Sequence, residues 1–244
     1  MMTSTTSEPT RGEKMYEGKA KVLFQTEDPK HLILYFKDDA TAFNAKKKGQ
    51  WDGKGRVNCR ISAVLTRLVE QAGVPSHFVR MLSDCEQLVK SVEIVPVEVV
   101  VRNVVAGSLA RRLGMDEGGP LSKPFVEFYY KSDPLDDPMI LPQWILEFGW
   151  ATQDELDKMS EYALIVNRVV GEFFAKRGIT LIDFKLEFGR FDGELLLADE
   201  ITPDGSRLWE QGTNRKLDKD RFRHSLGQEA ETYNELLGIV EGTE

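Results

Sequence analysis

The chain has 244 residues, of which 41% are hydrophobic and 30% are charged, and its formal net charge is −8. This composition is ordinary for a soluble globular protein, and the length suits one large domain or two modest lobes. The acidic balance argues against a nucleic-acid partner, and no apolar run approaches the ~20 residues needed to cross a membrane.

The N-terminal segment, residues 1–13, is polar and lacks the apolar core of a secretory signal, so we expect a disordered tail on a cytoplasmic protein. Cys59 and Cys85 show neither metal-ligand spacing nor a disulfide framework, and we expect both thiols to be reduced. The three histidines lie far apart in the sequence. A zinc site or a serine-hydrolase triad is therefore not expected.

The N-terminal part of the chain predicts a meander of strands and one helix. The helix is predicted over residues 56–73, because apolar side chains recur at helical spacing until Gly73 ends the pattern. The other expected elements are two short strands over 14–28 around a turn at Gly18, a strand over 31–39, a Gly-rich loop over 46–55, and strands over 77–82, 86–95 and 96–105.

The C-terminal part mixes helices with one hairpin. Its longest predicted helix covers residues 152–178, where Thr152 and Glu155 form a capping-box pattern and Gly178 ends the helix. Because helices do not alternate regularly with strands, we predict an α+β fold with antiparallel sheet. The remaining expected elements are a short helix over 106–114, an irregular loop over 131–142, a hairpin over 181–200, a loop with a short helix over 203–228 and a closing helix over 229–240.

The hairpin carries an unusual charged face. Residues two apart in a strand share a face, so Asp183, Lys185 and Glu187 follow one another at roughly 7 Å. A two-residue turn would pair Leu186 with Asp199 and bury that carboxylate on the apolar face. A three-residue loop would pair Lys185 with Asp199 instead, and we choose this register because burying an unpaired carboxylate is costly.

In the chosen register Glu187 and Asp199 are diagonal neighbours with Lys185 between them. Two converging carboxylates repel one another and usually need a cation, and Mg²⁺ is normally held by one or two carboxylates together with phosphate oxygens. A solvated charged face with cross-strand salt bridges would produce the same pattern, so the residues alone leave both interpretations open.

Three further stretches offer anion-binding groups. Lys19 and Lys21 flank the Gly18 turn, whose backbone N–H groups would suit phosphates, although a basic turn on a surface is common. Arg102 ends an apolar strand shortly before Ser108, which is also consistent with a capping serine and a surface arginine. The third stretch contains Arg207, Lys219, Arg221 and Arg223, which could equally form ordinary salt bridges with Asp218 and Asp220.

Two segments, residues 93–108 (EIVPVEVVVRNVVAGS) and 181–189 (LIDFKLEFG), closely resemble the signature segments of the SAICAR synthetase (phosphoribosylaminoimidazole-succinocarboxamide synthase) family of purine biosynthesis. The resemblance extends to YEGKAK at 16–21, GWAT at 149–152 and the stretch 199–223, and it covers the chain from about Met15 onward. Motifs of this length are far more specific than a lone glycine fingerprint.

The resemblance implies a ligase that uses ATP and Mg²⁺ to join L-aspartate to the carboxylate of the ribonucleotide CAIR through an acyl phosphate. It implies a SAICAR synthase-like fold, in which residues 14–94 form an antiparallel-sheet ATP lobe similar to those of kinases and ATP-grasp enzymes. Residues 95–244 would form a larger α+β lobe with the metal and ribonucleotide sites, and the active site would lie between the lobes. Family members also suggest a homodimer.

The family's functional residues are carried over only where the motifs match. Lys21, Lys185 and Asp199 are the expected catalytic residues, and Glu187 and Asp199 would hold Mg²⁺. The expected cofactor contacts are Gly18, Lys19, Ala20 and Lys21 around the ATP phosphates, Lys185 at the transferred phosphoryl group, Lys131 on the rim, and Val97 and Glu98 at the adenine edge. The expected ribonucleotide contacts are Arg102, Ser108, Arg207 and Arg223, with Lys219 and Asp137 on the same rim.

Two rival interpretations remain. A small-molecule kinase on the same scaffold would share the basic turn and the carboxylate pair but would not need aspartate. A nucleotide-binding regulatory module would be expected to lack one of the key charges, whereas Lys185, Glu187 and Asp199 are all present. The residues do not indicate where aspartate binds.

Overall fold

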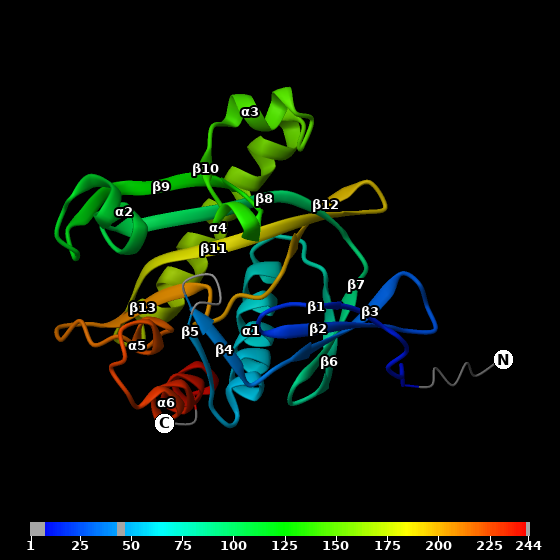
Figure 1. The fold of residues 1–244 in the computed structure, drawn as a ribbon, viewed down its shortest axis with the longest axis horizontal. Coiled ribbons are helices and arrows are strands. Elements are labelled where there is room, and N and C mark those ends of the chain that lie inside the picture. Colours follow the sequence, from blue (N-terminus) through cyan, green and yellow to red (C-terminus); the bar gives the residue numbers. More distant parts are fainter. Residues whose placement is uncertain (1–7, 43–46, 243–244) are drawn as a thin grey trace.

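The computed structural model describes residues 8–42 and 47–242 and contains two large sheets with helices around them (Figure 1). Residues 1–7 of the expected tail and residues 43–46 lie outside the described residues. All strand pairs of both sheets are antiparallel, so the predicted α+β class is confirmed. No helix in the described ranges is long and apolar enough to cross a membrane.

The first sheet is built from the N-terminal meander. In its middle strand, buried and exposed side chains do not alternate regularly, because Leu32, Ile33, Leu34 and Phe36 are all buried. The strand order is β1 (Lys14–Glu17), β2 (Lys21–Gln25), β3 (His31–Phe36), β7 (Glu86–Lys90) and β6 (Phe78–Ser83). The turn between β1 and β2 contains Gly18 and Lys19, and Lys21 begins β2, so the two predicted lysines lie at the turn.

The second sheet follows the order β10 (Met139–Ile140), β9 (Pro120–Tyr130), β8 (Glu93–Val104), β11 (Ile179–Phe191) and β12 (Glu194–Ala198), and β13 (Ser206–Glu210) also pairs with β11. Strand β8 is rich in valine, and it is flanked by β9 and β11. A separate two-stranded sheet joins β4 (Asp39–Ala42) to β5 (Lys47–Gln50).

Helices complete the core between and behind the sheets. Helix α1 (Lys54–Gln71) lies beside both sheets, and α4 (Gln153–Ala175) packs against the second sheet (Figure 1). The capping box at Thr152 and Glu155 is formed as predicted, with both reciprocal hydrogen bonds. The other helices are α2 (Gly107–Leu113), α3 (Pro142–Glu147), α5 (Asp220–Arg223) and α6 (Glu229–Glu241), with a 3₁₀ turn at Asp133–Leu135.

Several predicted segments differ from the structure. Strand β5 occupies part of the expected loop over 46–55, strand β10 lies within the expected irregular loop over 131–142, and strand β13 lies within the expected loop over 203–228. Helix α3 begins at the end of the loop over 131–142 and covers residues for which no element was predicted. The predicted tail is also too long, because Gly12 and Glu13 exchange backbone hydrogen bonds with Gln25 and Arg11 pairs with Glu86. The division into lobes at residues 94 and 95 remains our proposal.

The predicted register of the β11–β12 hairpin is wrong. Phe191 pairs with Glu194 and Glu187 pairs with Ala198, so the turn has two residues, Asp192 and Gly193. The expected cost of this register does not arise, because the strand ends before Asp199. That residue has a left-handed φ of 68°, and its side chain leaves the apolar face.

Candidate active site

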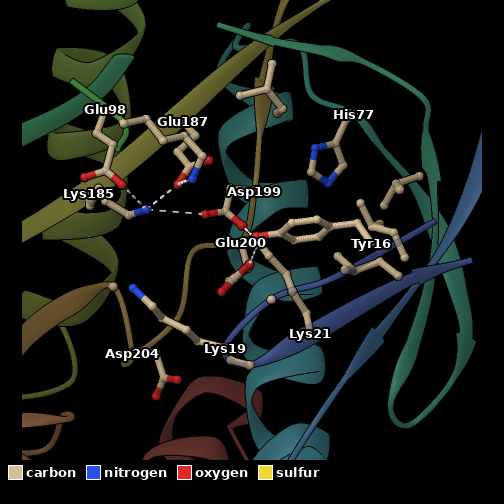
Figure 2. A pocket seen from close by; sticks show the side chains of 18 of the residues that line it. Tyr16, Lys19, Lys21, His77, Glu98, Lys185, Glu187, Asp199, Glu200 and Asp204 are labelled. Carbon is tan, nitrogen blue, oxygen red and sulfur yellow. Dashed lines mark hydrogen bonds and ion pairs between the residues drawn. The ribbon is translucent and has the colours of Figure 1, made fainter. Parts of the chain in front are cut away.

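A cavity of about 540 Å³ lies between the two sheets. The turn between β1 and β2 contributes Gly18, Lys19, Ala20 and Lys21 to its lining, and the second sheet contributes a cluster of carboxylates and one lysine (Figure 2). The predicted residues Glu98, Lys131, Asp137, Lys185, Glu187, Asp199 and Lys219 all line the same cavity. The fold therefore brings the predicted phosphate turn and the predicted carboxylate pair together.

Lys185 is the centre of the carboxylate cluster. Its Nζ lies 2.9 Å from Oε1 of Glu98 and 3.7 Å from Oδ2 of Asp199, and it also contacts Oε1 of Glu187 (Figure 2). Burial alone lowers the pKa of Lys185, but the charges of Glu187 and Glu98 outweigh it and raise the pKa above the ordinary value. Lys185 is therefore a permanent cation on the cavity floor.

The carboxylates on the floor do not behave alike. Burial raises the pKa of Glu187, but the charges of Lys185, Lys131 and Lys21 outweigh this effect and lower it to about 2. Burial likewise outweighs the attraction of Lys185 at Glu98, whose pKa is raised. Glu187 is thus fully ionised at neutral pH and is suited to a cation.

The basic turn faces this floor from the first sheet. Lys21 Nζ lies 2.5 Å from Oε2 of Glu200 and contacts Oδ1 of Asp199, and the turn itself is closed by a hydrogen bond from Gly18 N to Lys21 O. Lys19 Nζ lies 2.7 Å from Oδ1 of Asp133 at the rim. Two ammonium groups and a tight backbone turn therefore stand opposite the carboxylates, an arrangement suited to a chain of phosphates.

The other end of the cavity is apolar. Leu23, Leu34 and Val89, which lie on β2, β3 and β7 of the first sheet, contribute to this apolar wall. Such a wall suits a planar base. His77 projects into it (Figure 2). Burial and the nearby charge of Lys21 lower the pKa of His77 to about 3, so the imidazole is neutral at physiological pH.

The donor set fits a magnesium ion shared with a substrate. Glu187 and Asp199 both contact Lys185, so their carboxylates face a common point, and carboxylate oxygens are the hard ligands that Mg²⁺ prefers. Within residues 8–42 and 47–242, no group of three or more His, Cys, Asp or Glu side chains is arranged to hold a metal by itself.

Four of the predicted ribonucleotide residues form a second cluster outside the cavity lining, namely Arg102, Ser108, Arg207 and Arg223. Arg102 is buried, and its guanidinium donates to Glu127 at 2.6 Å, Asp183 at 3.0 Å and Ser108 at 2.7 Å. Arg207 joins the network through Asp183 at 2.9 Å. Arg207 and Arg223 both pair with Asp220, at 2.7 and 2.6 Å. Of the salt bridges that the sequence left open, those of Arg207 and Arg223 to Asp220 are formed, whereas Asp218 accepts hydrogen bonds from the backbone N–H groups of Leu208 and Asp220. Asp183 and Asp220 thereby connect Arg102, Arg207 and Arg223 into one network.

Gly107 explains how Arg207 reaches this network. Gly107 has a left-handed φ of 54°, and a Cβ added there would lie 2.5–2.6 Å from the guanidinium atoms of Arg207. The guanidinium therefore lies directly against the backbone at the start of α2, beside Ser108. A side chain at this position would displace it.

The backbone of residues 98 and 99 is occupied at the predicted adenine edge. Val97 is fully buried and does not line the cavity, and residues 97–99 pair with β9 on one side and, from Glu98 onward, with β11 on the other. A strand paired on both sides has no free backbone groups to offer a base. Of this segment, only the side chain of Glu98 reaches the cavity.

Sequence reasoning missed six polar cavity residues, namely Tyr16, His77, Lys90, Asp133, Glu200 and Asp204. Glu200 and Asp204 lie in the loop after β12, where no periodic pattern assigns a direction to a side chain. Their acidic character next to Asp199 was the available signal, since three carboxylates within six residues of a mostly apolar region are unusual.

Comparisons with known proteins agree with this geometry. The family model described as SAICAR synthetase matches residues 14–239. The phosphoribosylaminoimidazole-succinocarboxamide synthase of Deinococcus radiodurans is 55% identical over 95% of this chain and 98% of its own length. The crystal structure of the corresponding synthase from Ehrlichia chaffeensis superposes with a TM-score of 0.92 at 45% identity, covering 94% of this chain and 98% of that one.

A SAICAR synthetase structure described as a complex with ADP superposes with a TM-score of 0.90 at 46% identity, covering 93% of this chain and 97% of that chain. The likeness to these structures spans both sheets, and the family match covers every predicted site residue. The SAICAR synthase-like fold expected from the sequence is therefore confirmed, and this chain belongs to the SAICAR synthetase family.

Proposed function

We propose that this chain uses ATP to ligate L-aspartate to the carboxylate of CAIR, giving SAICAR, ADP and phosphate in purine biosynthesis. Family membership supports the reaction, and the ADP complex of a relative supports the use of ATP. The structural observation that carries the proposal is the position of Lys185. Its ammonium is held by Glu98, Glu187 and Asp199 directly opposite the basic turn at Lys19 and Lys21.

The proposed course of the reaction has two steps. A carboxylate oxygen of CAIR attacks the γ-phosphorus of ATP, the bond to ADP breaks, and an acyl phosphate forms. The neutral amine of aspartate then attacks the acyl carbon, phosphate leaves, and the nitrogen loses one proton to yield the amide. Lys21 and Lys185 offset the charge on the transferred phosphoryl group, which is the main contribution a protein makes to such transfers.

Glu187 and Asp199 would hold Mg²⁺ in the loaded enzyme. When bound, such an ion neutralises phosphate charge and orients the transferred group. The residues themselves prepare this site, since Lys131 and Lys185 keep Glu187 ionised and Lys185 keeps both carboxylates directed at one point.

The arginine network would hold the ribonucleotide. Arg102, Ser108, Arg207 and Arg223 supply donors for a phosphate at the edge of the second sheet, and Lys219 lines the cavity between this network and the carboxylates. In this proposal the phosphate takes over donors that now bond to Asp183 and Asp220 or to Ser108. Planar guanidinium groups suit that exchange, because each can serve a carboxylate and a phosphate at once.

We also propose a cytoplasmic homodimer. Large apolar side chains are exposed around β9, β10 and α3. A monomeric protein would be expected to bury them, whereas in a dimer the second subunit would cover them. The side chains concerned are Leu113, Met115, Phe125, Met139, Leu141, Trp144 and Phe148, and Phe148 is 65% exposed.

Isotope transfer tests the acyl phosphate. CAIR labelled with ¹⁸O in its carboxylate would be incubated with ATP, Mg²⁺ and L-aspartate, and the released phosphate would be analysed by mass spectrometry. The proposal predicts one ¹⁸O atom in each phosphate, because one carboxylate oxygen leaves with the phosphoryl group. Unlabelled phosphate accompanied by SAICAR formation would contradict the intermediate.

A further inference from the structure

Lys54 is a fully buried charged side chain that the proposed chemistry does not use. The residue is 0% exposed at the first position of α1, and its Nζ lies 2.6 Å from Oδ2 of Asp204. Burying an ammonium group is costly unless it is paired, and an apolar pair of similar volume is often at least as stable. The presence of this pair therefore calls for a reason other than stability.

Asp204 is held from several directions. The hydroxyl of Tyr233 in α6 donates to Oδ1 at 2.8 Å, and Lys219 Nζ lies 3.7 Å from Oδ2. Burial alone raises the pKa of Asp204, but the charges of Lys54 and Lys219 outweigh it, so the carboxylate stays ionised. Asp204 also lines the cavity near Lys19 (Figure 2).

The start of α1 is joined rigidly to the phosphate turn. A Cβ on Gly55 would lie 2.4 Å from the carbonyl oxygen of Phe36, so the helix begins in direct contact with the end of β3. The carboxylate of Asp38 accepts a hydrogen bond from Gly55 N at 2.8 Å. The next link is the hydrogen bond from Lys37 N to Ala20 O, also 2.8 Å, which reaches the turn itself.

Asp204, the ion-pair partner of Lys54, is joined to the carboxylate floor, the surface formed by Lys185, Glu187 and Asp199. Gly205, next to Asp204, accepts a hydrogen bond from the backbone N–H of Lys185 at 3.0 Å. The same loop begins at Asp199, whose left-handed backbone needs support from its surroundings. Movement of Asp204 would therefore be passed to both Lys185 and Asp199.

We propose that Lys54 is a positioning residue that sets the distance between the phosphate turn and the carboxylate floor through its ion pair with Asp204. This inference rests on the proposed function, which places the phosphates between these two surfaces. Neither partner of the pair touches the reacting atoms in this account. Misplacement of one surface by about 1 Å is enough to cost on the order of 100-fold in rate.

The test compares ADP binding by calorimetry with and without MgCl₂ in the wild type and in Lys54→Met. Affinity without Mg²⁺ should be unchanged, because the apolar wall and the basic turn remain. The gain in affinity on adding Mg²⁺ should fall roughly tenfold, and kcat should fall by roughly 10- to 100-fold, because both depend on the two surfaces together. Lys54→Arg should restore part of the gain.

Tyr233→Phe provides a milder perturbation if Lys54→Met fails to fold, because it removes only the hydroxyl that holds Asp204. It should show the same loss of the Mg²⁺-dependent gain at a smaller amplitude. Tyr162→Phe, a helix residue packed on Phe188, is the matched control and should behave as the wild type. A lowered melting temperature with an unchanged Mg²⁺-dependent gain in either folded variant would overturn the proposal.

A double variant, Lys54→Met with Asp204→Leu, adds an independent check. If the two residues act only as a pair, the double variant should lose no more kcat than Lys54→Met alone. Additive losses would overturn the proposal. Failure of the proposed function is recognised separately, because the wild type would then show no aspartate-dependent ADP release while the ADP-binding comparison would still report on Lys54.

Discussion

Lys185 Nζ lies 3.7 Å from Oδ2 of Asp199, although the two residues are not partners across the β11–β12 hairpin. Asp199 follows the last paired residue, Ala198, and turns back toward the charged face through a left-handed backbone with a φ of 68°. The contact therefore depends on a local conformation at the end of a strand. It does not depend on cross-strand pairing.

Asp199→Asn should lower kcat by roughly 100-fold or more, because it removes one of the two charges that would hold Mg²⁺. Asn tolerates the left-handed conformation, so the melting temperature should change little. Steady-state kinetics with saturating Mg²⁺ and a thermal melt measure both effects.

Asp192→Asn is the matched control for this substitution. Asp192 also has a left-handed φ, of 48°, but it lies in the exposed hairpin turn and pairs with Lys30. The control should keep wild-type kinetics. Wild-type activity of Asp199→Asn would remove the basis for the proposed metal site.

Gly107→Ala should raise the KM for the ribonucleotide and leave the KM for ATP nearly unchanged. The added Cβ would displace the guanidinium of Arg207, whose atoms lie 2.5–2.6 Å from its position. Gly114→Ala separates this effect from backbone strain, because Gly114 has a similar φ of 63° and nothing within 4 Å of an added Cβ. Equal KM changes in the two variants would show that strain alone is responsible.

The lowered pKa of the buried His77 predicts that the protein loses stability in mild acid. The pKa of His77 is about 3 in the folded protein because the imidazole is buried, whereas the ordinary pKa of histidine is 6.5. Below pH 6.5 the unfolded chain binds a proton that the folded chain does not, so stability is complete above that pH and falls as the pH approaches 3. The expected loss for wild type between pH 7 and 5 is roughly 2 kcal/mol.

His77→Gln should remove that part of the pH dependence, and His224→Gln, at an exposed position, should not. Urea unfolding at pH 7 and pH 5 gives the free energies of unfolding that the comparison needs. A wild-type difference that persists unchanged in His77→Gln would assign the acid sensitivity to other groups.

The charged face of residues 183–187 could be predicted because a strand alternates with a fixed period. The register could not, because the cost assigned to burying Asp199 assumed that β12 continued through it, and a single left-handed residue removed that cost. Strand β9 escaped prediction for a related reason. Its residues Pro120 and Pro124 argue against a strand, yet β10 is short and leaves much of this edge unpaired, where proline is tolerated.

The contribution of Lys54 also could not be predicted from the sequence. A lysine in a Gly-rich stretch is usually a solvated loop residue, and its complete burial depends on Asp204 and Tyr233, which lie 150 or more residues away in the sequence. Contacts of this kind are created by tertiary packing and leave no local periodic signal.

Coupled ADP release with ATP, Mg²⁺ and CAIR, measured with and without L-aspartate, tests the proposed function most directly. The account predicts that release requires both CAIR and L-aspartate and that SAICAR accumulates in equal amount. ADP release that requires CAIR but is indifferent to aspartate would contradict the ligase reaction and identify a phosphotransferase on the same scaffold.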